Sequence, residues 1–449
     1  MKTFAYDGVH ALVLGLGVSG EAATRLLLMR GSRVVAVDQG KDQRQIEVAA
    51  ALREAGAEVS IGIEVLPADA FDLCVVSPVF DINHPWLAIC KQRGIPVISE
   101  LELGSHYTQG KILAVTGSKG KSSLVKWCAD TLNSAGLSAA PAGNYGTPLS
   151  QLVVENPNLQ WNVTEVSSFQ MEHTEHFTPD IAILLNIQED HLDRHSDMNE
   201  YVSLKLKMFN NMLAGSVAIL PAGLEVQACI PQDVVFWRFG AGAGSDWVFA
   251  DHEVSGLIQG RRSHVSISGT WFDNPIFGLA AAAGVAALRA AGLSESQIAN
   301  GLQAFEPLPH RMQEVCTDSR GVRYVNDSKA TSLAATGAAL RMMGKSVRLI
   351  AGGLLKEHHP EILKELLTET TKKVYLIGRC SEVLSEAWSS TVPCEECGTL
   401  EQAVEVVAQE AESGDVVLLS PGTASFDQFK SYRERGERFM AKVRAVTDL

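Results

Sequence analysis

The chain has 449 residues, 46% of them hydrophobic and 20% charged, which is the ordinary balance of a globular protein. Its length exceeds what one compact core supports and predicts two to three domains. The formal net charge of −14 excludes the broad positive surface that a nucleic acid or an anionic membrane requires, so we expect neither as a partner.

Residues 9–105 alternate short β-branched runs with helical patterns, which is typical of a parallel sheet with crossover helices. The stretch VLGLGVSG contains Gly15, Gly17 and Gly20, and the next strand pattern ends in Asp38. This matches the dinucleotide-binding fingerprint, so NAD-dependent oxidoreduction is one hypothesis. The same turn can receive any pyrophosphate, and a tight turn without a ligand is the structural alternative.

The stretch VTGSKGKSS, which begins at Val115, resembles a phosphate-binding loop but lacks the first glycine of the Walker A pattern. Gly117 and Gly120 allow backbone N–H groups to converge, and Lys121 can reach terminal phosphates. Ser122 would supply a hydroxyl to Mg²⁺. Because strand, loop and helix patterns follow in this order, we predict nucleotide binding rather than a polar surface turn.

A metal site is predicted beside this loop, because Glu165 ends the strand pattern of NVTEVSSFQME. The following segment, NIQEDHLDRH, gathers four potential metal ligands: Asp190, His191, Asp193 and His195. Its His-x-x-x-His spacing leaves the zinc site of a metallohydrolase as an alternative. Only one or two of these side chains need to face inward, and we expect Asp193 and His195 to be solvated.

The second half of the central block predicts further elements. NEYVSLKLKMF places Lys205 on an amphipathic helical pattern, where a surface lysine is the default interpretation. Between residues 216 and 270 the strand patterns come closer together, which predicts antiparallel hairpins. The alanine-rich stretch 276–292 contains Arg289 and is short for a membrane span, so we predict a buried helix.

The N-terminus and the cysteines indicate a cytoplasmic protein. The N-terminal apolar run leads directly into a glycine turn, which is not a signal-peptide layout. The eight cysteines are scattered, as in a reducing compartment, except for Cys394 and Cys397 in CEEC. We interpret this single CxxC as coincidental spacing rather than a redox or zinc half-site.

A third block follows EPLPHR (306–311), whose two prolines predict a linker. Strand and helix patterns alternate again, and three polar stretches lie at strand ends: 326–332, 351–357 and 420–439. In open α/β sheets such ends face the ligand crevice, so three of them in one domain predict a substrate pocket.

Taken in order, these motifs resemble the Mur ligases. The stretches that match are GLGVSG, TGSKGKSS, TEVSSFQME, NIQEDHLDRH, KLKMF, LPHR, NDSKAT and SPGTASFDQF. They cover nearly the whole chain, and the last two are typical of the members that add D-glutamate. The resemblance implies a monomeric ATP-dependent ligase of peptidoglycan precursor synthesis, which joins D-glutamate to UDP-N-acetylmuramoyl-L-alanine through an acyl phosphate.

The resemblance also implies the fold, which is α/β with three domains. A Rossmann-like UDP-binding domain is expected at 1–107, and a P-loop ATPase-like domain with a small antiparallel sheet at 108–308. A second Rossmann-like domain, which binds the amino acid, is expected at 309–449.

The resemblance assigns a role to each matching position. The substrate-binding positions are Gly15, Gly17, Ser19, Asp38, Gln39, Ser77, Asn144, Lys329, Thr331, Lys356, Ser425 and Tyr432. The ATP-binding positions are Gly117, Ser118, Lys119, Gly120, Lys121, Ser122, Ser123, Asn274, Arg311 and Asp327. Two Mg²⁺ ions would be held by Ser122, Glu165, His191 and Lys205, the last as a carbamate. The catalytic set would be Lys121, Glu165, His191, Lys205 and Arg311.

Some positions depart from the family pattern. Phe277 stands where an asparagine usually hydrogen-bonds adenine, which predicts relaxed nucleotide selectivity with measurable use of GTP or CTP. Asp273 replaces a histidine in the same motif. Val79 and Gln39 alter the expected UDP pocket, and Lys119 adds charge near the phosphates. The rival hypotheses are a related ligase for another amino acid such as L-glutamate, an NAD-linked oxidoreductase, and a non-catalytic nucleotide-binding module.

Overall fold

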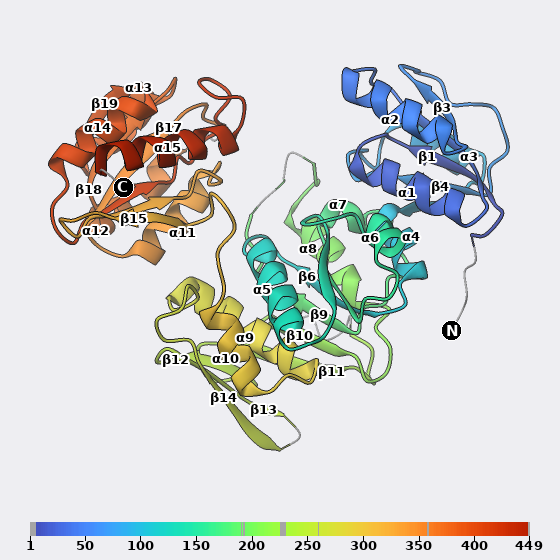
Figure 1. Cartoon of the computed structure of the whole chain (residues 1–449), viewed down its shortest axis with the longest axis horizontal. Helices are drawn as coiled ribbons and strands as arrows, with labels where there is room; N and C mark the ends of the chain where they lie inside the picture. The colour runs from blue at the N-terminus through green and yellow to red at the C-terminus, as the bar shows by residue number, and fades with distance from the viewer. Residues whose placement is uncertain are drawn as a thin grey trace. The chain divides into compact units, whose positions relative to one another are not determined.

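The computed structural model describes residues 6–189, 191, 194–224, 230–258, 260–356 and 359–447 (Figure 1). Residue contacts divide the chain into two units. Unit 1 comprises Met1–Asp273 and Phe277–Phe305, and unit 2 comprises Glu306–Leu449 with the short segment Asn274–Ile276.

Unit 1 begins with a five-stranded parallel sheet in the order β3-β2-β1-β4-β5. Its strands are β1 (His10–Leu14), β2 (Arg33–Asp38), β3 (Glu58–Ile61), β4 (Leu73–Val76) and β5 (Val97–Ser99). Its helices are α1 (Val18–Met29), α2 (Gln43–Glu54), α3 (Pro85–Gln92) and α4 (Glu100–Tyr107). The strand order reverses between β1 and β4, which places the glycine turn after β1 at the edge where such sheets bind ligands.

The rest of unit 1 is built on a nine-stranded sheet in the order β14-β13-β12-β11-β10-β9-β6-β8-β7. The strands are β6 (Lys111–Thr116), β7 (Ala139–Gly143), β8 (Trp161–Glu165), β9 (Ile181–Leu184), β10 (Val217–Pro221), β11 (Val235–Gly240), β12 (Trp247–Ala250), β13 (Glu253–Ile258) and β14 (Arg261–Ser266). The helices are α5 (Lys121–Ser134), α6 (Leu149–Glu155), α7 (Ser168–Met171), α8 (Met198–Leu206), η1 (Lys207–Phe209), α9 (Pro275–Ala290) and α10 (Glu295–Gln303).

The prediction of antiparallel hairpins between residues 216 and 270 is wrong for the first two strands. β10 pairs in parallel with β9 and β11, and β11 pairs in parallel with β12. Only β12, β13 and β14 pair in the antiparallel sense, as an extension of the larger sheet. The connection from β10 to β11 spans residues 222–234, and about a dozen residues suffice for a parallel crossover. Spacing along the chain could not distinguish this crossover from a long hairpin loop.

The predicted buried helix at 276–292 is confirmed as α9. Its central residues are excluded from solvent and pack against α5, where Trp127 and Leu124 are fully buried. No helix among the described residues is both long enough and apolar enough to cross a membrane.

Unit 2 contains a six-stranded sheet in the order β15-β16-β20-β17-β18-β19, in which only the β15–β16 pair is antiparallel. The strands are β15 (Gln313–Thr317), β16 (Arg323–Asn326), β17 (Val347–Gly352), β18 (Thr371–Ile377), β19 (Cys394–Gly398) and β20 (Val416–Leu419). The helices are α11 (Leu333–Met343), η3 (Pro360–Leu363), α12 (Lys364–Thr370), α13 (Ser381–Trp388), α14 (Leu400–Glu410) and α15 (Tyr432–Thr447).

The three polar stretches predicted in unit 2 follow β16, β17 and β20. These strands are adjacent and parallel in the sheet, with Asn326 beside Leu419 and Leu419 beside Ile350. The polar stretches therefore leave the sheet at one common edge. The predicted α/β class, with three sheets covered by helices, is confirmed.

Candidate functional site

The phosphate loop joins β6 to α5, and its two glycines take backbone conformations that other residues avoid. Gly117 has φ 143° and Gly120 has φ 87°. The loop rests on the segment after β9, because Asn186 Oδ1 accepts hydrogen bonds from the backbone N–H groups of Ser118 and Lys119, at 3.2 and 2.9 Å. The first turn of α5 begins at Lys121, so its N–H groups face the loop, as an anion-binding helix requires.

Two lysines converge on one carbonyl oxygen of this loop. Lys121 Nζ donates to Gly117 O at 2.7 Å, and Lys205 Nζ donates to the same oxygen at 3.0 Å. Lys205 is 2% exposed and its ammonium lies 4.4 Å from the ring centre of Tyr201. The interpretation of Lys205 as a surface lysine is therefore wrong, because α8 turns this residue toward the phosphate loop.

Glu165 lies at the end of β8 and is 2% exposed. Its Oε1 accepts a hydrogen bond from Asn144 Nδ2 at 2.7 Å, whereas its Oε2 is buried and has no hydrogen-bond partner among the described residues. β8 lies beside β6, with Glu165 level with Val115. A buried carboxylate oxygen without a partner next to a phosphate loop fits a hard divalent cation such as Mg²⁺.

The two histidines of the predicted cluster have different environments. His191 is exposed, with φ 58° and its ring 4.8 Å from that of Phe169. His195 is 3% exposed and its Nε2 lies 2.9 Å from Ser168 Oγ, so the expectation that it is solvated is wrong. Asp190 and Asp193 lie outside the described residues. Within the described residues, no three His, Cys, Asp or Glu side chains gather as a metal cluster.

In the glycine turn after β1, both carboxylate oxygens of Asp38 accept hydrogen bonds from other residues of the protein. Its Oδ2 accepts from Leu16 N at 2.6 Å, and its Oδ1 accepts from Gly40 N at 2.7 Å and from Gln45 Nε2 at 3.0 Å. Asp38 therefore shapes the turn. Gly20 permits close packing of α1, because a Cβ there would lie 1.7 Å from Gly15 O.

Other UDP-matching positions surround Phe80. A Cβ on Gly15 would lie 2.8 Å from Phe80 Cε2 and 3.2 Å from Ser77 Cβ. The Phe80 ring contacts the ring of His84, whose Nε2 lies 3.3 Å from Gln39 Oε1. Gly17 and Ser19 lie at the start of α1, where Gly17 is exposed and Ser19 is half-buried.

In unit 2, Asp327 is almost fully buried. Its Oδ2 accepts from Ser420 Oγ at 2.9 Å and its Oδ1 accepts from Met312 N at 3.2 Å. Burial raises the pKa of Asp327 to about 7, although these hydrogen bonds act in the opposite direction. Asp327 thus joins the segment after β20 to the segment that contains Arg311.

The other predicted residues of unit 2 differ in exposure. Lys329 Nζ lies 4.0 Å from the ring centre of Tyr432, which brings two predicted substrate positions together. Ser425 is 2% exposed, Thr331 is half-buried and Lys356 is exposed.

Phe277 belongs to an aromatic cluster in unit 1. Its ring centre lies 3.9 Å from that of Trp271, so the ring packs against a tryptophan within its own unit. Asp273 pairs with His252 at 2.5 Å, which raises the pKa of the exposed His252 through the hydrogen bond to the carboxylate. Asn274 Oδ1 accepts from the backbone N–H of Ile276 at 3.2 Å.

Sequence reasoning missed two arginines. Arg194 lies inside the motif NIQEDHLDRH, and its guanidinium donates a hydrogen bond to Phe80 O at 2.6 Å. Arg435 is fully buried and donates to Ser328 O and Thr423 O at 2.9 and 3.1 Å, which joins two of the polar loops. In both cases the sequence feature that could have indicated the residue was a basic side chain within a polar motif.

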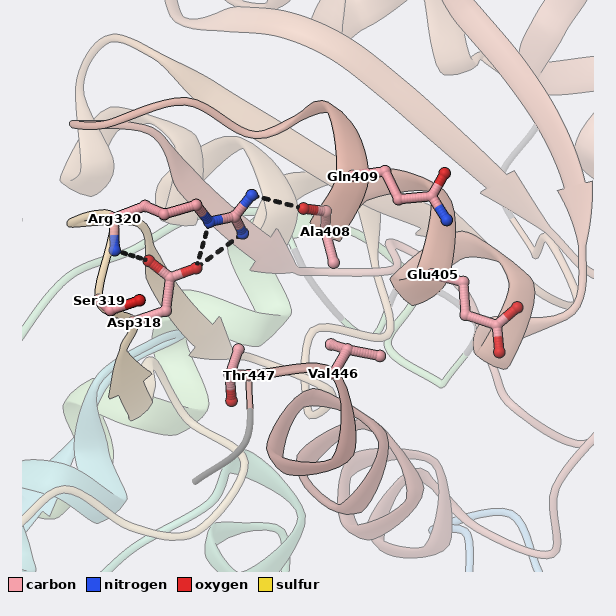
Figure 2. Close-up of a pocket in the computed structure, with 8 residues that line it drawn as sticks. All are labelled: Asp318, Ser319, Arg320, Glu405, Ala408, Gln409, Val446 and Thr447. Carbon is pink, nitrogen blue, oxygen red and sulfur yellow. Dashed lines mark hydrogen bonds and ion pairs between the residues drawn. The ribbon is translucent and has the colours of Figure 1, made fainter.

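A cavity of about 360 Å³ in unit 2 lies apart from the predicted residues (Figure 2). Its lining includes Asp318, Arg320, Glu405 and Thr447. Figure 2 shows Arg320 held by Asp318 and by the carbonyl of Ala408. None of the sequence-predicted site residues lines this cavity.

Comparisons with known proteins agree with the motif order. The family model described as the Mur ligase middle domain matches residues 115–279, and that described as the Mur ligase, glutamate ligase domain matches residues 310–422. A UDP-N-acetylmuramoylalanine--D-glutamate ligase of Koribacter versatilis is 35% identical over 98% of each chain. The protein of the same name from Nitratidesulfovibrio vulgaris is also 35% identical, over 98% of this chain and 97% of its own.

Solved structures share the fold at lower sequence identity. The MurF ligase of Thermotoga maritima in complex with ADP is 17% identical, with a TM-score of 0.64 over 100% of this chain and 99% of its own. A MurF of Acinetobacter baumannii has a TM-score of 0.60 at 16% identity, over 99% of this chain and 92% of its own. On the evidence of the full-length relatives, this chain belongs to the Mur ligase family.

Proposed function

We propose that this chain is the ATP-dependent ligase that adds D-glutamate to UDP-N-acetylmuramoyl-L-alanine, giving ADP and phosphate, in peptidoglycan precursor synthesis. Relatives that carry this name match it over nearly its whole length. The observation that carries the proposal is the group around the phosphate loop: Lys121, the buried Lys205, and the unpartnered oxygen of Glu165. An NAD-linked oxidoreductase would have no use for these residues.

A carboxylate does not condense with an amine in water until its oxygen becomes a good leaving group. The alanyl carboxylate of the substrate would therefore attack the γ-phosphoryl group of ATP, forming an acyl phosphate and ADP. Lys121 would leave Gly117 O and neutralise charge on the terminal phosphates, together with the N–H groups at the start of α5. The amine of D-glutamate would then attack the acyl carbon and release phosphate.

Ser122, Glu165, His191 and Lys205 are the residues that would hold Mg²⁺. When bound, Mg²⁺ would supply positive charge to the phosphates. An ammonium on Lys205 would repel such an ion, whereas a carbamate would offer it anionic oxygens. The carbamate nitrogen keeps one hydrogen, so its hydrogen bond to Gly117 O is compatible with the modification.

In unit 2 we assign the D-glutamate carboxylates to Lys329, Thr331, Lys356, Ser425 and Tyr432, and the ATP ribose to Asp327. Arg311 would contact the transferred phosphoryl group, and Asn144 would contact the substrate while it orients Glu165. The attacking amine must lose a proton, and we assign this step to the exposed His191, which can accept the proton only while its basic ring nitrogen is not bound to Mg²⁺. We further propose domains at 1–107, 108–308 and 309–449, and a cytoplasmic monomer.

The proposal is tested by ADP release coupled to a spectroscopic readout, with UDP-N-acetylmuramoyl-L-alanine and a panel of amino acids. We expect turnover with D-glutamate and at least about a hundred-fold less with L-glutamate. The variant Lys121→Ala should lose turnover. Faster turnover with L-glutamate or another amino acid would replace the proposal with the related ligase, and turnover that survives Lys121→Ala would contradict the role of the phosphate loop.

A further inference from the structure

Arg194 connects the segment after β9 to the loop after β4, within unit 1. Its Nη2 donates to Phe80 O at 2.6 Å and its Nη1 donates to Val79 O at 3.3 Å. Glu172 holds the other side of the guanidinium, accepting from Nε at 3.1 Å and from Nη2 at 2.7 Å. The Arg194 side chain is 15% exposed and that of Glu172 is 3% exposed, so this ion pair is shielded from water.

Another anchor of the loop that Arg194 holds is Phe80, whose ring stacks on the buried Trp86 with 5.9 Å between the ring centres. The side chain of Val79 is 81% exposed, so it does not fix the backbone by burial. The Phe80 N–H donates to Ser77 O at 3.1 Å, and the Phe80 ring lies against Gly15 and His84. The guanidinium of Arg194 therefore fixes the carbonyl side of a short turn whose aromatic side chain closes over the glycine turn.

We propose that Arg194 is a positioning residue for the UDP end of the substrate, holding Val79 and Phe80 so that the Phe80 ring forms one wall of the uridine diphosphate site. This inference rests on the proposed function, because it takes the glycine turn as the UDP site. The hydrogen bonds from the planar guanidinium of Arg194 to Glu172 and to the carbonyls of Val79 and Phe80 are charge-assisted. A lysine, which has a single terminal nitrogen, cannot reproduce all of these contacts.

The Arg194 side chain also lies next to residues that are assigned to phosphoryl transfer. The guanidinium carbon of Arg194 is 4.5 Å from the ring centre of Phe169, which in turn lies 4.8 Å from the ring of His191. Arg194 N donates to His191 O at 3.1 Å. This backbone hydrogen bond does not depend on the Arg194 side chain, so Arg194→Lys leaves it in place.

The test uses the full-length variants Arg194→Lys and Phe80→Ala. The dissociation constant of UDP is measured by calorimetry, and KM is measured separately for each substrate. For both variants we expect the dissociation constant of UDP and the KM of the UDP-linked substrate to rise at least about ten-fold, with the KM of ATP changing less than about two-fold. Phe80→Ala leaves the Arg194–Glu172 pair intact, so it separates loss of the wall from loss of the ion pair.

Arg320→Lys is the matched control. Arg320 makes the same kinds of contact in unit 2, to Asp318 and to the carbonyl of Ala408 (Figure 2), although its side chain is 43% exposed. It should leave UDP binding unchanged. If both Arg194→Lys and Phe80→Ala bind UDP with a dissociation constant within two-fold of the wild-type value, the inference alone is overturned. The same holds if the KM of ATP rises as much as the KM of the UDP-linked substrate. A wild-type protein that binds no UDP would overturn the proposed function together with it.

Discussion

At the scale of single residues, burial changes the chemistry that a side chain can perform. Lys205 follows the same amphipathic pattern as many surface lysines, but it is 2% exposed and its Nζ contacts Gly117 O. The neighbouring lysine Lys207 is half-buried and donates to Met171 O at 3.4 Å, away from the phosphate loop. Two lysines on one helical segment therefore differ in what they can do because they face different neighbours.

We expect activity to depend on carbon dioxide if Lys205 acts as a carbamate. The neutral amine forms an N–C bond with carbon dioxide and releases one proton to solvent. Removing bicarbonate should therefore lower turnover, and adding it back should restore turnover. Lys205→Ala should reduce kcat by about a hundred-fold or more with little change in ATP affinity, because the effect is on charge stabilisation during phosphoryl transfer.

Lys207→Ala serves as the control for Lys205→Ala and should keep its turnover and its bicarbonate response. Mass spectrometry under carbon dioxide trapping would detect the modification directly. Equal turnover of Lys205→Ala and the wild-type protein would rule out this role.

At the scale of elements, close packing of α9 against α5 positions the phosphate loop at the start of α5. Gly284 makes this approach possible, because a Cβ there would lie 2.2 Å from Trp127 Cζ3 and 2.7 Å from Leu124 Cδ1. Both of these side chains are fully buried and cannot move aside into solvent. The glycines and alanines of α9 therefore serve helix packing, and the composition of this helix follows from its place in the core.

Gly284→Val should lower the free energy of unfolding of unit 1 by about 1–3 kcal/mol or more, because overpacking forces α9 away from α5. Thermal unfolding followed by tryptophan fluorescence would measure the change. Ala290→Val, at the half-buried end of the same helix, introduces the same β-branched side chain without this contact and should cost less. Similar melting temperatures for the two variants would contradict the packing argument.

At the scale of the whole molecule, the two units have separate cores, so stability must be measured in each one. Asp327 makes unit 2 sensitive to pH because burial raises its pKa to about 7. In the unfolded chain a carboxyl titrates near its ordinary value of about 4. The folded state therefore binds the proton more tightly, and stability present at low pH is lost as the pH rises from about 4 to about 7.

We expect the free energy of opening of β16, β17 and β20 to fall across this pH range, by up to roughly 4 kcal/mol from Asp327 alone. Hydrogen exchange of the amides in these strands would measure it. Asp327→Asn has the same shape and does not titrate, so its opening free energy should depend less on pH. An identical pH dependence in the two proteins would show that Asp327 is not the group responsible.

The sequence by itself determined the α/β class, the buried helix α9, the order of the motifs and, through that order, the family. These features are encoded locally, because hydrophobic periodicity and the residues of a turn act over a few neighbours. The placement of three polar loops at one sheet edge also followed, since parallel strands end on the same side.

Only the tertiary structure decided which side chains are buried and which groups they meet. Lys205 and Gly117 are 88 residues apart in sequence, and Arg194 and Val79 are 115 apart. The burial of His195, the unpartnered oxygen of Glu165 and the parallel pairing of β10 with β11 likewise depend on segments that are distant along the chain. A side chain's solvation and partners are set by whatever the fold packs against it, and no local pattern contains that information.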